Sequence, residues 1–216
     1  MGRLLVVCAL ALLLAATAAA RSPRVEQLAL TQADPAAAKS AVLRASDLGT
    51  AWTAKVENAR DDSAPDCPFQ DYSRFTITGE AQTRFSQQGA SVVSRVEVYK
   101  SKADAAGDFG VDTRPRTAQC EGRVIRASFA KASPGTKVTL ESAKLTAAPK
   151  IGQRSVAMRI VLGVRAGSRT LRVYIDLIGF VRDRAAASIV VVAPGVPAKG
   201  AAQLARIVDA RLSRAA

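Results

Sequence analysis

The chain has 216 residues, with 31 lysines and arginines against 18 aspartates and glutamates, a formal net charge of +13 and no histidine. The missing histidine excludes the imidazole-dependent machinery of serine and cysteine hydrolases and the commonest zinc sites. The basic balance favours anionic partners, although the basic residues are scattered without a polybasic cluster, so that composition alone also accounts for them.

The first twenty residues have the pattern of a cleavable secretory signal peptide. Arg3 precedes an apolar run over residues 4–16, and the small residues 18–20 follow it, so we expect cleavage after Ala20. The alternative is a membrane anchor, which would need about 20 apolar residues. Cys8 lies inside the apolar run and not after it, so lipid attachment at this cysteine is not expected. The pattern predicts a secreted or cell-envelope-associated protein.

Removal of residues 1–20 leaves a polar, flexible lead over residues 21–33 and a single domain over residues 34–216. The domain begins with a helix signal, because Asp34 is a favourable N-cap and Pro35 suits the first helical position. Alanine-rich sequence follows and continues the predicted helix.

Two cysteines remain in the mature chain, Cys67 and Cys120, and Cys67 lies in a loop rich in Pro and Asp. In an oxidising compartment they most simply form one disulfide, which stabilises the fold by about 4 kcal/mol for a loop of this length. Two buried free thiols are the alternative, and a metal site is less favoured because the two cysteines are far apart and histidine is absent.

Strict alternation of apolar and polar residues predicts a β-hairpin in the first half of the domain. Its strands cover residues 75–85 and 92–99, and Gln88-Gly89 forms the turn. The residues expected to share one face of the first strand are Phe75, Ile77, Gly79, Ala81, Thr83 and Phe85. Ser101 and Asp104 then resemble a capping box that opens a short helix over residues 105–109, bounded by Gly110 and Pro115.

The second half is rich in predicted strands. They cover residues 137–146, 155–164, 171–182 and 188–193, and Pro197 opens a last amphipathic helix over residues 198–213. In the third of these strands Leu171, Val173, Ile175, Leu177 and Val181 are expected to point inward. The predicted fold is α+β: a twisted, mainly antiparallel sheet of five to seven strands with about three covering helices and one disulfide.

A combination of short motifs is familiar. They are Asp47-Leu48-Gly49 with Trp52, Cys67, Ser94–Tyr99, Ser101 with Asp104-Ala105, Cys120, Ile151-Gly152 with Arg154-Ser155, Val173–Asp176 and Arg182–Arg184. With them the chain resembles the extracellular sensor domain of the mycobacterial PknH-type serine/threonine kinases, and the freestanding exported actinobacterial proteins that share it, over about residues 36–214. The kinase sensor has a second cysteine pair, which this chain lacks. The resemblance implies a non-enzymatic, ligand-binding fold with a cleft on one face of the sheet.

Polar side chains alternate along neighbouring predicted strands and are the candidate ligand-binding residues. They are Arg95, Tyr99, Arg159, Arg172, Tyr174 and Asp176. An Arg–Asp pair beside a tyrosine can orient a small polar ligand, and arginine can form a bidentate contact with a carboxylate or phosphate. The alternative is an ordinary cross-strand ion pair on a solvated sheet face.

We therefore expect an exported, non-enzymatic binding or sensor-like domain that takes a small molecule or a cell-envelope component in a sheet-face cleft. It is expected to be monomeric, to use no cofactor or metal, to bind no nucleic acid and to have no transmembrane segment in the mature chain. One alternative is a structural or protein-interaction module that docks by its basic surface onto anionic envelope polymers. A second alternative is a hydrolase that uses loop carboxylates, either Asp61-Asp62 or Asp66 with Asp71.

Overall fold

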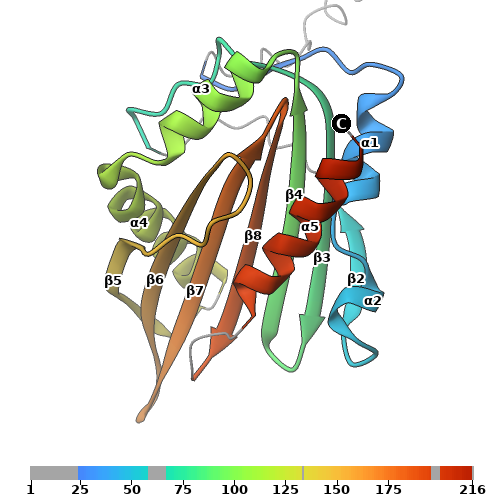
Figure 1. Cartoon of the computed structure of the whole chain (residues 1–216). Coiled ribbons are helices and arrows are strands. Elements are labelled where there is room, and N and C mark those ends of the chain that lie inside the picture. The colour runs from blue at the N-terminus through green and yellow to red at the C-terminus, as the bar shows by residue number, and fades with distance from the viewer. Residues whose placement is uncertain (1–23, 58–66, 133, 196–199, 216) are drawn as a thin grey trace, which may run out of the picture.

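A computed structural model describes residues 24–57, 67–132, 134–195 and 200–215, and an eight-stranded sheet lies at its centre (Figure 1). The predicted signal peptide, the loop carboxylates Asp61-Asp62 and Asp66, and Pro197 lie outside the described residues. The strands are β1 (Gln27–Leu28), β2 (Thr53–Glu57), β3 (Thr76–Gln87), β4 (Ala90–Tyr99), β5 (Lys137–Thr146), β6 (Arg154–Ala166), β7 (Arg169–Arg182) and β8 (Ala185–Pro194). The helices are α1 (Asp34–Ala41), α2 (Ala45–Leu48), α3 (Lys102–Asp112), α4 (Pro115–Ala132) and α5 (Ala201–Ala215).

The strand order is β1-β3-β4-β8-β7-β6-β5. Strand β2 also pairs with β3, further along the same edge on which β1 pairs. Every pairing is antiparallel except that of β1 with β3. The last four strands form a meander that docks onto the β3–β4 hairpin through β8. The α+β class and the mainly antiparallel sheet predicted from the sequence are confirmed.

The hairpin turn follows from its residues. Gln88 and Gly89 both have positive φ, 44° and 82°, which is the backbone that a two-residue turn between twisted strands requires. The predicted sharing of one face along all of β3 is wrong, because a bulge between Ile77 and Gly79 inserts Thr78. Ile77 therefore packs with α3, whereas Phe85 packs on the opposite side of the sheet.

Helices cover both faces of the sheet. Helices α1 and α5 pack on one face, here called the α5 face: α1 contacts β3 and β4, and α5 contacts β7 and β8 (Figure 1). Helices α3 and α4 pack on the other, here called the α3/α4 face. The core of the α5 face includes Phe85, Val92, Val96, Ile178, Phe180, Ile189 and Val208. The cores of the α3/α4 face include Phe75, Ile77, Phe109, Met158, Ile160, Leu162, Val173 and Ile175.

The segment after the hairpin holds more helix than predicted. Ser101 caps α3, as expected, and its hydroxyl accepts a hydrogen bond from the Asp104 amide at 3.0 Å. The helix continues past Gly110 to Asp112, however, and Pro115 opens α4, a helix of 18 residues that the sequence analysis missed. Proline at the first position of a helix lacks only an N–H that would have no partner there, so it starts a helix as readily as it ends one.

The two cysteines are joined as predicted. Cys67 and Cys120 form a disulfide with a Cα–Cα distance of 5.9 Å. Cys120 lies inside α4 and not after the end of a short helix, so the bridge ties the segment ahead of β3 to the body of α4.

Two local predictions need correction. Asp34 does not cap α1, because Ala33 occupies the N-cap position; its carboxylate instead pairs with Arg184 at 3.0 Å. Leu171, predicted to point inward, is 47% exposed near the tip of the β6–β7 hairpin, beyond the part of the sheet that the helices cover.

Candidate functional site

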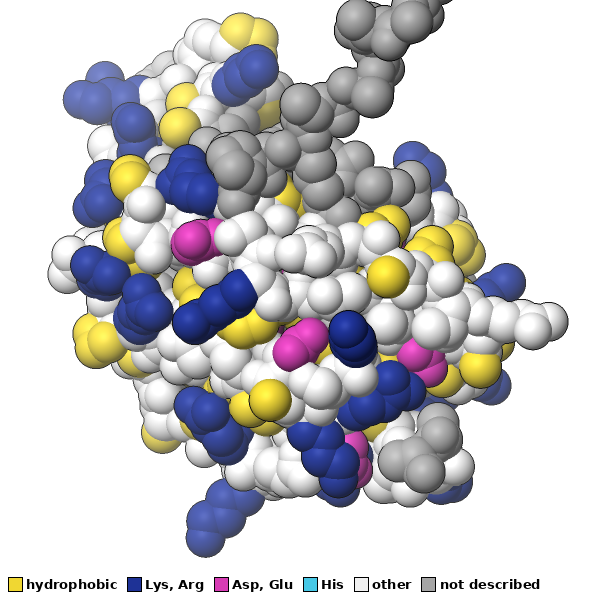
Figure 2. Space-filling view, turned by 90° about the horizontal axis from the view of Figure 1, so that it is seen from above, with side chains coloured by type: hydrophobic (Ala, Val, Ile, Leu, Met, Phe, Trp, Pro, Cys, Tyr) yellow, Lys and Arg dark blue, Asp and Glu magenta, His cyan; other side chains and the backbone are white. Residues whose placement is uncertain are grey.

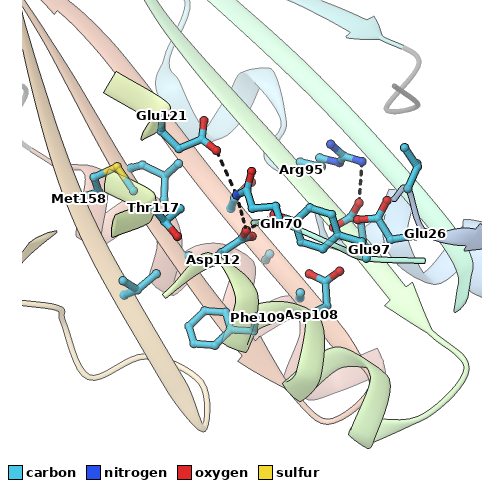
Figure 3. A pocket seen from close by; sticks show the side chains of 18 of the residues that line it. Glu26, Gln70, Arg95, Glu97, Asp108, Phe109, Asp112, Thr117, Glu121 and Met158 are labelled. Atoms are coloured by element: carbon cyan, nitrogen blue, oxygen red, sulfur yellow. Dashed lines mark hydrogen bonds and ion pairs between the residues drawn. The ribbon is translucent and has the colours of Figure 1, made fainter. Parts of the chain in front are cut away.

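A cavity of about 580 Å³ lies between the α3/α4 face and the helices that cover it (Figure 3). Its walls come from α3, α4 and two segments ahead of β3 that include Glu26, Gln70 and Tyr72. Its volume is within the usual range for small-molecule sites in proteins. The cavity is the strongest candidate site in the described chain because it joins an apolar floor to several buried polar groups.

Small side chains on the sheet leave the hollow open. Arg95, Ser188, Gly179 and Val156 form one cross-strand row over β4, β8, β7 and β6, and all four line the cavity. Larger side chains at the two central positions of this row would fill the space between sheet and α3. Val156, Met158 and Leu177 complete an apolar floor.

Arg95 and its carboxylate neighbours form one end of the cavity (Figure 3). An Arg95 Nη2 lies 2.6 Å from Glu97 and 4.0 Å from Glu80, and Glu97 raises the pKa of the guanidinium. The buried Tyr99 hydroxyl donates to Glu97 at 3.2 Å. Arg95 Nε has no hydrogen-bond partner among the described residues. The arginine charge is therefore matched by carboxylates while one of its donors stays available.

Asp108 is the second unsatisfied group. It lies on the inner side of α3, is 5% exposed, and its Oδ2 makes no hydrogen bond within the described part of the chain. Burial, together with the negative charges of Glu97, Asp112 and Glu26, raises the pKa of the Asp108 carboxyl well above its usual range, against the lowering effect of a hydrogen bond with Tyr99. A buried carboxyl with a vacant acceptor costs free energy unless something donates to it.

Asp112 anchors a third polar group, one helical turn further along α3. Its Oδ1 accepts hydrogen bonds from the Tyr72 hydroxyl and from Gln70 Nε2, the latter at 3.4 Å. Gln70 Nε2 also donates to Glu121 of α4 at 3.2 Å. Burial raises the pKa of Asp112 to about 7, against the lowering effect of the Tyr72 hydrogen bond. Burial and the nearby Asp112 likewise raise the pKa of Tyr72.

The disulfide fixes this side of the cavity. Cys67 precedes Gln70 and Tyr72 by only a few residues, and Cys120 is adjacent to Glu121. The bridge therefore holds the Gln70–Tyr72 segment against α4 where both contribute cavity-lining side chains.

The fold is similar to that of a solved extracellular domain. The solved extracellular domain of PknH from Mycobacterium tuberculosis superimposes with a TM-score of 0.53 over 83% of this chain and 96% of that chain, at 12% sequence identity. No family model matches the sequence, and no curated protein matches it. The resemblance predicted from the motifs is thus confirmed at the level of the fold, and the neighbour is an extracellular domain.

The six predicted ligand-binding residues are divided between the two faces of the sheet. Arg95 lines the cavity, and the Tyr99 hydroxyl donates a hydrogen bond to Glu97, which also lines it. The other four, Arg159, Arg172, Tyr174 and Asp176, lie on the α5 face, and none of them is among the described residues that line the cavity.

Three of the four residues on the α5 face form ion pairs. Arg159 forms a bidentate pair with Asp176 directly across β6 and β7, at 2.6 and 3.0 Å. Arg172 Nε lies 2.8 Å from Glu141, and Tyr174 is half-buried nearby. Their arrangement is that of the cross-strand ion pair considered as the alternative, and a ligand role for them stays a prediction.

The acidic residues that matter most to the cavity were not predicted from the sequence. Asp108 and Asp112 are four residues apart and so lie on one side of α3, the same side as the buried Ala105 and Phe109. Carboxylates in register with the apolar stripe of a helix are a readable signal for a polar site. It was hidden because the helix was predicted to end at Phe109.

Proposed function

We propose that this protein is an exported, non-enzymatic binding domain of the sensor type, and that it takes a small molecule in the cavity under α3 and α4. The observation that carries the proposal is a preformed cavity of about 580 Å³ in which Asp108 Oδ2 and Arg95 Nε have no partner among the described residues. Polar groups aimed into an apolar cavity are what fixes a ligand in most small-molecule sites.

Three further observations support this proposal. The signal-peptide pattern of residues 1–20 supports export. The fold is similar to that of the extracellular domain of PknH. Within the described residues no helix is long and apolar enough to cross a bilayer.

The test is native mass spectrometry and a thermal-shift screen on the mature protein recovered from culture medium. A Ser188→Phe variant fills the cavity floor, and a Ser91→Phe variant makes the same change on β4 away from the cavity. We expect a small molecule that binds the parent protein and Ser91→Phe but not Ser188→Phe. Binding that Ser188→Phe retains unchanged, or no binding from medium or cell extract, refutes the proposal.

A second candidate function is docking to anionic envelope polymers through the outer surface. Figure 2 shows lysine and arginine side chains scattered over one face of the molecule, with few acidic ones among them. This function predicts retention on purified cell wall that falls steeply with ionic strength. Retention that is unaffected by salt, or no retention, counts against it.

A further inference from the structure

Acidic side chains outnumber basic ones in the lining of the cavity, the reverse of the balance in the whole chain. Five carboxyl side chains line it, namely Glu26, Glu97, Asp108, Asp112 and Glu121, out of 18 acidic residues in a chain of net charge +13. Arg95 is the one basic side chain among the described residues that line it. Arg95 is itself paired with Glu97 and Glu80.

The vacant acceptor on Asp108 defines what is missing. The titratable groups that act most strongly on Asp108 are Glu97 of β4, Asp112 of α3, Glu26, and Tyr99 of β4, which hydrogen-bonds to it. Three of these four are carboxyls, so an anion placed beside Asp108 would be repelled. A positively charged hydrogen-bond donor would both fill the vacant acceptor and reduce the repulsion among the carboxyls.

A metal ion does not fit this arrangement. Among the described residues no three carboxyls, cysteines or histidines come together closely enough to hold a metal ion. Figure 3 shows Glu26, Glu97 and Arg95 at one end of the cavity and Glu121 at the other, while Phe109 and Met158 contribute apolar surface. Carboxyls spread along an apolar cavity suit an elongated organic cation.

We propose that the ligand is an organic amine or guanidine with an apolar chain, whose positive head donates to Asp108 beside Glu97 and whose chain lies on Met158 and Leu177. This inference rests on the proposed function and names its ligand class. The charge it assigns is opposite to that of the envelope polymers which the outer surface would attract.

The proposal includes a proton balance. Asp108 and Asp112 hold their protons more firmly than ordinary carboxyls, and a bound cation favours their ionised form. Binding therefore releases protons to the solvent, and affinity rises as the pH increases toward and past about 7, the pKa of Asp112 in the free protein. A neutral ligand would show neither effect.

The test is isothermal titration calorimetry of the mature protein with pentane-1,5-diamine, spermidine and agmatine at constant ionic strength. Pentane-1,5-diol and glutarate are the neutral and anionic controls of matched length, and Ca²⁺ is the control for a metal. We expect at least one of the three organic cations to bind, and the diol, glutarate and Ca²⁺ not to bind. Titration in buffers of different ionisation enthalpy is expected to show proton release on binding.

Variants assign the site. Asp108→Asn removes the charge at nearly constant shape and is expected to weaken binding at least about tenfold, since a hydrogen bond between charged groups is lost. Asp183→Asn, a matched change outside the cavity where the aspartate pairs with Lys102 at 2.6 Å, is expected to leave affinity unchanged.

Three results overturn the inference. They are no binding of any of the three cations, binding of the diol or glutarate as tight as that of the diamine, and unchanged affinity in Asp108→Asn. A neutral or anionic molecule whose binding is abolished by Ser188→Phe would refute the charge assignment while leaving the proposed function intact. If no molecule in the screen binds the parent protein, both the charge assignment and the proposed function are refuted.

Discussion

The pKa of Asp112 indicates how much stability the protein loses by burying this carboxyl beside the cavity. Its pKa is about 7 in the folded protein against an ordinary value of 3.8. A carboxyl whose pKa is raised on folding holds its proton more firmly in the folded state, so the contribution of Asp112 to stability is greatest below about pH 4 and falls as the pH rises through 7. The expected cost of its ionised form is therefore present at neutral pH.

The magnitude follows from that difference. At 1.36 kcal/mol per pH unit, the interval between 3.8 and about 7 corresponds to roughly 4 kcal/mol, and partial exposure of the Asp112 side chain to solvent reduces it to about 2 kcal/mol. Asp112→Asn removes the ionisation and keeps an acceptor for Tyr72 and Gln70. We therefore expect the variant to gain about 2 kcal/mol in free energy of unfolding, relative to the parent, between about pH 4 and pH 8.

The assay is urea unfolding at several pH values, followed by the fluorescence of Trp52, which packs against the core of the α5 face. The slope of the stability difference against pH is the informative quantity, because a constant offset would only report how well asparagine fits. Asp183→Asn is the control of opposite sign: the ion pair with Lys102 lowers the pKa of Asp183, so its removal costs stability as the pH rises. A difference for Asp112→Asn that does not change with pH would refute the reasoning.

Three further predictions concern stability. Cys67 and Cys120 are 53 residues apart, and replacing both with serine is expected to lower the free energy of unfolding by about 4 kcal/mol in urea titrations. A loss under about 1 kcal/mol would contradict the stabilising role of the disulfide. Gly79→Ala would bring Cβ to 2.3 Å from the backbone of Asp34, so we expect a loss of about 2 kcal/mol and a lower melting temperature; an unchanged melting temperature would show that α1 is not packed against β3 as described. Ile189→Ala opens a void under α5 at a residue with 0% exposure and is expected to lower the free energy of unfolding by about 3 kcal/mol. A loss as small as that of a surface substitution would show that α5 does not cover this face of the sheet.

Features that depend on residues close together in the sequence were predicted better than features that depend on packing. The hairpin at Gln88-Gly89, the cap at Ser101 and the strand over residues 137–146 were predicted correctly, because turn conformation, capping and alternation depend on residues only a few positions apart. The disulfide was predicted because two cysteines leave one pairing. The errors at Pro115 and Thr78 arose where one local signal is compatible with two structures, a helix start or a stop, and a continuous strand or a bulge.

The sequence by itself therefore determined the α+β class, most element positions, the disulfide and the net charge, since each is a property of local pattern or composition. Only the tertiary structure decided which strand face carries a site. Both faces of the meander have polar residues, but α5 and ion pairs occupy one, while small residues at Gly179 and Ser188 leave space on the other. Asp108, Glu97 and Glu121 come together there because α3, α4 and β4 pack side by side, a relation that no spacing along the chain contains.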